Sequence, residues 1–186
     1  MMVVRHAGAG GYGDPLEREP WRVAEDVASG AVSRTTAHDV YGVECLQSGG
    51  VEAAQTQILR QKMREERLGW PLLSETVTPD PIAKKTSTGE APRLVHEYVI
   101  SRDQGEFRVL ACALCDSVIG DYRANYKLGL RMDESPMSSL PHVDDPKVFL
   151  DEDIVFRRYC CPECAVLMST EIVRASEPPL VDMVLF

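Results

Sequence analysis

The spacing of apolar positions changes near the middle of the chain. In the first half, apolar residues recur three or four positions apart among polar ones, as in amphipathic helices. In the second half, short runs alternate apolar and polar residues, as in strands. Residues 71–92 separate the halves with four prolines and the polar run KKTSTGE, and such a stretch sustains neither a helix nor a central strand. The pattern predicts an α+β fold with short N-terminal helices, a linker and a small β-rich C-terminal domain.

Capping signals define the short helices of the first half. Asp14, followed by Pro15 and Glu17, has the form of a capping box with proline at the first helical position, so a helical turn is expected to begin there. A second helix is expected from Pro20 to Ser29 and a third between Ser33 and Gly42, because serine favours a helix start and glycine a helix end.

A longer helix is predicted from the segment VEAAQTQILRQKMREERLG. Val51, Ala54, Ile58 and Met63 fall near one side of that helix, charged residues surround the rest, and Gly69 ends it. The predicted divisions of the chain are residues 1–45, a helix at 46–70, the linker at 71–92 and the β-rich domain at 93–186.

The second half predicts several strands. RLVHEYVIS and EFRVLACALC are expected to form a hairpin around Gly105, since glycine between alternating segments favours a turn. Further strands are expected at DIVFRRYCC, AVLMSTEIV and LVDMVLF.

Two Cys-x-x-Cys pairs lie in the β-rich half, each directly after a predicted strand. They are Cys112 with Cys115, and Cys161 with Cys164. A two-residue spacer lets a tight turn point two thiolates at one ion, so two such turns can complete a tetrahedral shell of four sulfurs around Zn²⁺. A shell of this kind leaves no position for water or substrate, so the sequence predicts a structural zinc site in a zinc-ribbon-like domain.

Three features leave alternatives to this zinc site open, and the first is that 45 residues separate the two cysteine pairs, more than in a compact ribbon. Cys160 directly precedes Cys161, and either thiol is a possible ligand, although the spacing favours Cys161. Asp116 and Ala165 stand where glycine commonly follows the second cysteine of a zinc knuckle. The remaining alternative is four thiols without metal or a redox dithiol.

Charge and composition narrow the function classes. The 186 residues carry a net charge of −9, which repels a polyanion, so nucleic acid is a poor partner. No apolar run approaches the roughly 20 residues that span a bilayer, and the N-terminus lacks the pattern of a signal peptide. The expected location is the cytoplasm.

The N-terminal motifs resemble a known family. GGYGDPLEREP, AVSRT and DVYGVEC occur in the same order in the extreme C-terminal tail of the hydantoinase B and oxoprolinase family. Residues 1–45 contain too few large apolar side chains to fold alone. The resemblance therefore implies that this segment is an extended docking arm, which packs on a large hydantoinase B-like subunit.

The C-terminal half resembles a second family, the gamma subunits of acetone carboxylases and their relatives. CALCDSVIGDYRANYKLGL, DEDIVFRRYCCPECAVLMSTEIV and EPPLVDMVLF carry this resemblance. It implies a small zinc-containing subunit of an ATP-dependent ketone carboxylase, which converts a ketone and bicarbonate to a β-keto acid. Hydantoinase A-like and B-like large subunits would be the partners and would hold ATP and a divalent cation. The added N-terminal segment favours an acetophenone carboxylase-like complex.

No catalytic residue is assigned to this chain, because it shows neither a phosphate loop with its lysine nor a nucleophile beside a base. Two other functions stay open: an independent zinc-ribbon adaptor, and an accessory subunit of a hydantoinase or oxoprolinase amidohydrolase. Ordinary loop, packing or interface roles are favoured for the remaining candidates, which are His142 with Asp144 and Asp145, His96, Tyr122, Tyr126 and Lys127.

Overall fold

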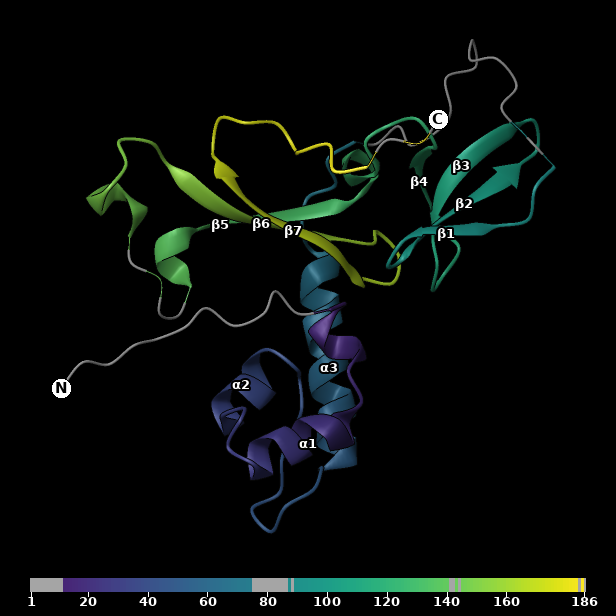
Figure 1. Ribbon diagram of the computed structural model, residues 1–186. Helices are drawn as coiled ribbons and strands as arrows, with labels where there is room; N and C mark the ends of the chain where they lie inside the picture. The colour runs from purple at the N-terminus through teal and green to yellow at the C-terminus, as the bar shows by residue number, and fades with distance from the viewer. Residues whose placement is uncertain are drawn as a thin grey trace.

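The computed structural model of the chain describes residues 12–74, 87, 89–140, 143, 145–183 and 185. A helical unit precedes two antiparallel sheets (Figure 1), and the β-rich part is C-terminal as expected. In Figure 1, helix α3 projects away from the sheets, and helices α1 and α2 lie beside the part of α3 that is far from the sheets. The predicted α+β organisation is confirmed.

The helical unit contains the four elements that the capping signals indicate. They are the 3₁₀ turn η1 (Pro15–Glu17) and the helices α1 (Pro20–Ala28), α2 (Arg34–Asp39) and α3 (Ala53–Leu68). The Asp14 side chain accepts a hydrogen bond from the amide of Leu16, and the Ser33 side chain accepts one from Thr36. Gly69 follows α3 directly.

The face that α3 buries differs from the predicted one. Ile58 is 62% exposed, whereas Thr56 is buried. The hydroxyl of Thr56 accepts a hydrogen bond from the amide of Glu44 (3.0 Å), and Arg60 donates to the carbonyl of Tyr41 (3.1 Å). Helix α3 therefore holds the preceding segment largely by polar contacts, which apolar periodicity does not reveal.

The described part of the N-terminal segment is not an extended arm. Val23, Ala37 and Val43 form a small buried cluster, and Arg60 of α3 donates to the carbonyl of Arg18 (2.7 Å). Helix α3 of the same chain therefore provides a surface on which this segment packs.

Seven strands form the two sheets. The four-stranded sheet has the order β1 (Arg93–His96), β2 (Val99–Gln104), β3 (Phe107–Cys112) and β4 (Val118–Asp121). The three-stranded sheet has the order β5 (Arg131–Pro136), β6 (Ile154–Cys160) and β7 (Leu167–Arg174). Short 3₁₀ turns lie at η2 (Tyr126–Gly129), η3 (Met137–Ser139) and η4 (Pro146–Val148).

Some strands of the structure differ from the predicted ones. RLVHEYVIS is not one strand, because a turn at Glu97 and Tyr98 divides it into β1 and the start of β2. Strands β4 and β5 were not predicted. The described residues of LVDMVLF form no strand. The carbonyls of Pro179 (3.0 Å) and Leu180 (3.3 Å) instead accept hydrogen bonds from the side-chain amide of Asn125.

The first residues of the expected linker pair with β5. The amide of Leu73 donates to the carbonyl of Leu130 (3.2 Å), and the amide of Met132 donates to the carbonyl of Pro71 (2.9 Å). Residues 75–86 of that linker lie outside the described residues. Helix α3 is thereby tied to the edge of the three-stranded sheet within a few residues of its end.

One core connects the two sheets, and η2 lies within it. Leu110 and Ile119 from the first sheet share this core with Tyr159 and Met168 from the second. Tyr126, from η2, is also fully buried there. Part of the connection between the sheets is therefore buried in this core.

Gly129, in η2, is expected to tolerate no side chain. A Cβ at this position would lie 1.7 Å from the carbonyl oxygen of Ile119, a backbone atom that cannot swing aside. Gly129→Ala should lower the free energy of unfolding by about 3 kcal/mol, measured by urea denaturation. Gly120→Ala is the matched control, because its Cβ would meet no heavy atom within 4 Å. Equal unfolding midpoints for the two variants would contradict this account.

Candidate metal centre

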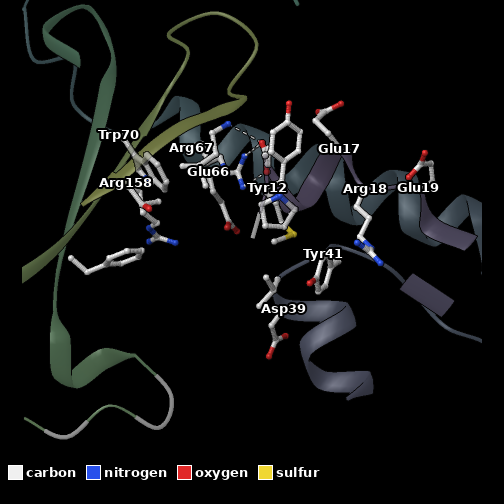
Figure 2. Close-up of a pocket in the computed structure, with 18 residues that line it drawn as sticks. Tyr12, Glu17, Arg18, Glu19, Asp39, Tyr41, Glu66, Arg67, Trp70 and Arg158 are labelled. Atoms are coloured by element: carbon white, nitrogen blue, oxygen red, sulfur yellow. Dashed lines mark hydrogen bonds and ion pairs between the residues drawn. The ribbon is translucent and has the colours of Figure 1, made fainter. Parts of the chain in front are cut away.

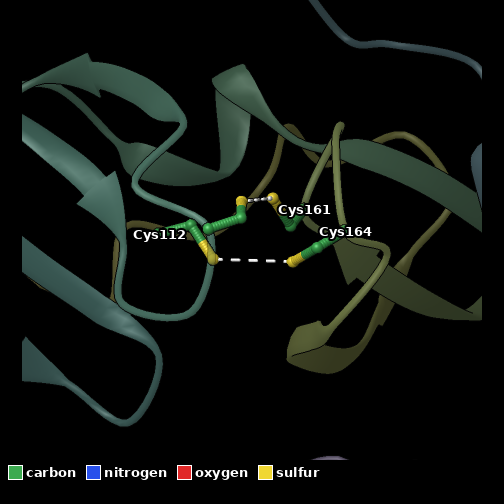
Figure 3. A group of neighbouring side chains, drawn as sticks. Cys112, Cys161 and Cys164 are labelled. Carbon is green, nitrogen blue, oxygen red and sulfur yellow. Dashed lines mark hydrogen bonds between the residues drawn. The ribbon is translucent and has the colours of Figure 1, made fainter.

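The four predicted ligand residues come together in the structure. The sulfurs of Cys112, Cys115, Cys161 and Cys164 all lie within 4.8 Å of one another (Figure 3). The sulfurs of Cys112 and Cys164 are 3.7 Å apart, and those of Cys115 and Cys161 are 3.6 Å apart. Four sulfurs at about 2.3 Å from a tetrahedral zinc are about 3.8 Å from each other. The donor set and its spacing therefore fit a metal such as zinc.

Each cysteine pair lies in its own turn, and the two turns have the same hydrogen-bond pattern. One turn connects β3 to β4 and the other connects β6 to β7. In each turn, the amide of the first cysteine donates to a carbonyl five residues further on, and the amide four residues further on donates back to the carbonyl of that cysteine. These bonds are Cys112 to Ser117 (2.8 Å), Asp116 to Cys112 (2.9 Å), Cys161 to Val166 (2.9 Å) and Ala165 to Cys161 (3.1 Å).

The two positions where glycine was expected do adopt the left-handed conformation. Asp116 has φ 62° and Ala165 has φ 60°, which costs roughly 1–2 kcal/mol for a residue with a side chain. Arginines contact both positions. Arg102 donates to the carboxylate (2.6 Å) and carbonyl (3.1 Å) of Asp116, and Arg67 donates to the carbonyl of Ala165 (3.0 Å).

Cys160 lies outside the four-sulfur group. Its thiol is buried and donates to the carbonyl of Arg67 at 3.7 Å. Burial raises the pKa of this thiol to about 12, although the nearby charge of Arg67 opposes that shift. The structure therefore gathers Cys161 and not its neighbour, as the spacing favoured.

The four sulfurs cannot all ionise without a cation. Hydrogen bonds from the thiols of Cys161 and Cys164 lower the pKa of Cys112 to about 2. The hydrogen bond with Cys112 is in turn the main reason that the pKa of Cys161 is raised. A hydrogen bond with Cys112 also raises the pKa of Cys164 to about 12. One thiolate is thus stabilised by protonated neighbours, and a divalent ion would replace those protons.

Lys127 and Tyr126 of the NYKLGL motif are buried and contact acidic side chains. The ammonium of Lys127 lies 3.0 Å from Glu171 and 2.9 Å from Asp182. Glu171 also accepts a hydrogen bond from the hydroxyl of Tyr159 (2.5 Å). Tyr126 is fully buried and donates to Asp182 at 3.3 Å. This motif therefore connects η2, the three-stranded sheet and the C-terminal segment, and the packing role favoured for Tyr126 and Lys127 agrees with these contacts.

Glu171 should make the stability of the chain sensitive to acid. Burial opposes its ionisation, but the hydrogen bonds from Tyr159 and Lys127 outweigh burial and lower its pKa below the ordinary 4.5. A lowered pKa means that its contribution is complete above pH 4.5 and is lost as the pH falls through the folded-state value. Glu171→Gln should therefore show a flatter decline of unfolding free energy below pH 4.5 than the wild type. An unchanged decline would contradict this role.

Asp14 connects the N-terminal segment to the second cysteine turn. Its buried carboxylate accepts hydrogen bonds from the amide of Leu167 (2.8 Å) and from two nitrogens of Arg67 (2.5 and 3.0 Å). The amide of Asp14 donates to the hydroxyl of Tyr98 (3.1 Å). Gly13 has φ 76°, and a Cβ there would lie 2.7 Å from Glu97 and from Tyr98. The Gly-Asp pair of GDPLER is thus required by contacts within this chain.

Other candidates do not extend the site. His142 and Asp144 lie outside the described residues. The ring of His96 lies 5.6 Å from that of Tyr126, a packing contact. Within the described part of the chain, no second group of three or more His, Cys, Asp or Glu ligand atoms is gathered closely enough for a metal. Among the described helices, none has the length and apolar character to cross a bilayer.

Two hairpins thus gather four cysteine sulfurs that could bind a metal such as zinc. The chain belongs to the acetone carboxylase gamma subunit family, which residues 93–185 match. It is also similar to the acetone carboxylase alpha subunit of Xanthobacter autotrophicus, with 30% identity over 131 residues. That match covers 68% of this chain and 14% of the relative, so the chain spans a small part of the relative's length. The matched region is longer than the gamma-family region, so the similarity to the alpha subunit includes residues before Arg93.

Proposed function

We propose that this chain is a non-catalytic, zinc-stabilised structural and assembly subunit of a multi-subunit, ATP-dependent ketone carboxylase. The observation that carries the proposal is the four-sulfur group, which is formed by two hairpins inside the region that matches the gamma subunit family. The reaction would join a ketone and bicarbonate to a β-keto acid. Zinc would hold the fold, through Cys112, Cys115, Cys161 and Cys164.

Two features support a structural role. Four protein ligands fill a tetrahedral zinc shell, so no position remains for substrate or water. The polar residues of NYKLGL, which are otherwise the best candidates for chemistry, are engaged in buried contacts with Glu171, Asp182 and the C-terminal segment. Nucleotide, ketone and divalent cation are therefore assigned to hydantoinase A-like and B-like partner subunits.

Two features support a role in assembly. The GDPLER segment resembles the tail of hydantoinase B-like subunits, and the similarity to an alpha subunit includes residues before Arg93. The helical unit also projects from the sheets (Figure 1). We therefore assign residues 1–45 and the helix at 46–70 to contacts with a large subunit, and 93–186 to the zinc domain, with 71–92 as linker.

Native mass spectrometry of the protein purified from its own cells tests the proposal. We expect a complex that contains large hydantoinase-like subunits, with zinc bound to each copy of this chain and lost to a chelator. Incubation of the complex with ATP, bicarbonate and a panel of ketones, including acetone and acetophenone, should then identify the substrate. A free, metal-loaded monomer would overturn the subunit assignment in favour of an independent adaptor.

A further inference from the structure

A groove of about 900 Å³ lies between the helical unit and the three-stranded sheet. Figure 2 shows Trp70 and Arg158 on the sheet side of this groove, and Asp39 and Tyr41 on the side of the helical unit. Helix α3 contributes Met63, Glu66 and Arg67 between them. Any molecule bound in the groove would contact the N-terminal segment and the gamma-family domain together.

The arginines of the groove are already paired. Arg67 binds the buried carboxylate of Asp14. Arg158 lies 2.7 Å from Asp133 and stacks on Trp70 at 4.9 Å. Arg18 lies 2.6 Å from Asp26. The described residues that line the groove include these three arginines and five carboxylates, at Asp14, Glu17, Glu19, Asp39 and Glu66, so the groove has an excess of negative charge.

Three of the carboxylates that line the groove are largely exposed to solvent. Glu19, Asp39 and Glu66 have side chains that are 55%, 60% and 65% exposed. Their ion pairs are with exposed neighbours on the same helix or beside it, at 3.5 Å, 2.7 Å and 3.9 Å. Exposed pairs of this kind contribute about 0–1 kcal/mol, so these carboxylates can change partner at little cost. The rim of the groove therefore favours a cationic ligand.

Apolar side chains accompany the carboxylates. Tyr12 is 89% exposed and Val40 is 44% exposed at the groove, while Trp70, Phe156 and Tyr41 line its interior. Exposed aromatic and branched side chains beside charged residues are typical of interaction surfaces. A ligand suited to this groove carries an apolar anchor and positive charges around it.

We propose that the groove is a docking site for an extended segment of a large subunit of the complex, with lysine or arginine flanking an aromatic or branched aliphatic anchor. This inference rests on the proposed function, because the partner is the large subunit of the same complex. Charge complementarity selects the segment: three exposed carboxylates face the ligand, and the groove's arginines are engaged by Asp14, Asp133 and Asp26. The anchor would lie against Val40 and Trp70.

Charge reversal in the full-length chain tests the docking site. Asp39→Lys with Glu66→Lys should weaken binding to the purified large subunits at least about tenfold, and Val40→Glu should weaken it similarly. Glu152→Lys and Leu94→Glu are the matched controls, because both side chains are exposed and lie outside the groove and outside the segments assigned to the large subunit. Melting temperatures equal to the wild type would show that the variants are folded. Affinities equal to those of the controls would overturn the docking site.

A photo-crosslinker at Val40, in the intact complex, identifies the occupant. The expected product joins this chain to a large-subunit peptide that contains lysine or arginine beside an apolar residue. A crosslink to residues 1–11 of this chain, to a second copy or to a bound small molecule would overturn the proposal. Failure of the wild-type chain to associate with any large subunit would instead refute the proposed function, so the two failures are distinguishable.

Discussion

Cys161→Ser is expected to abolish zinc binding and the folded state of the β-rich domain together. The reason is that the four sulfurs come from both sheets, since Cys112 is the last residue of β3 and Cys161 directly follows β6. Structural zinc contributes about 10 kcal/mol or more in small zinc-binding peptides, whereas whole domains are stable by about 5–15 kcal/mol. Zinc content by mass spectrometry and near-ultraviolet circular dichroism would both fall in the variant.

Cys160→Ser is the matched control for this experiment. The two cysteines are adjacent in sequence, and both are buried, but the thiol of Cys160 contacts the carbonyl of Arg67 and not the sulfur group. The control should keep its full zinc content and lose only a weak hydrogen bond. Normal zinc in Cys161→Ser, with loss of zinc in Cys160→Ser, would reverse the ligand assignment.

Signals confined to a few consecutive residues predicted their structures well. The side chains of Asp14 and Ser33 cap the helical turns that follow them, although Glu17 bonds Arg64 and does not complete a capping box. The Cys-x-x-Cys spacing brings the four sulfurs together. In these cases the physical cause lies within a single turn of chain, so a short stretch of sequence contains it. The left-handed φ of Asp116 and Ala165 shows that the turn geometry persists even without glycine.

Features that depend on distant partners were not predictable from the sequence in this way. The C-terminal LVDMVLF reads as a strand, yet Asn125 and Glu171 bond the backbone at its start. Nothing near Gly129 in sequence indicates that the carbonyl of Ile119 occupies the space that a Cβ would need. Arg67 lies within an ordinary charged helix pattern, although it contacts both Asp14 and the second cysteine turn. Burial of these groups is decided by tertiary contacts and not by spacing.

The contacts of Asp14 change the interpretation of the tail-like segment. The segment resembles part of a large subunit, and docking on such a subunit was the expected role of its motif. In this chain the carboxylate is instead buried against Arg67 and Leu167. The Asp14 carboxylate of the GDPLER motif therefore connects the helical unit to the second cysteine turn of the same chain, and the proposed docking groove lies beside that contact.

Asp14→Asn should be the most damaging substitution in the N-terminal segment. It removes the charge that Arg67 contacts. It also replaces by an NH2 donor one of the two oxygens that accept hydrogen bonds from Arg67 and from the amides of Leu16 and Leu167. Loss of one partner of a buried ion pair costs about 3–5 kcal/mol, so the free energy of urea unfolding should fall by about that amount. Asp26→Asn is the control, since its pair with Arg18 is partly exposed and should cost about 1 kcal/mol or less. Equal losses in the two variants would mean that Asp14 does not hold the helical unit to the zinc domain.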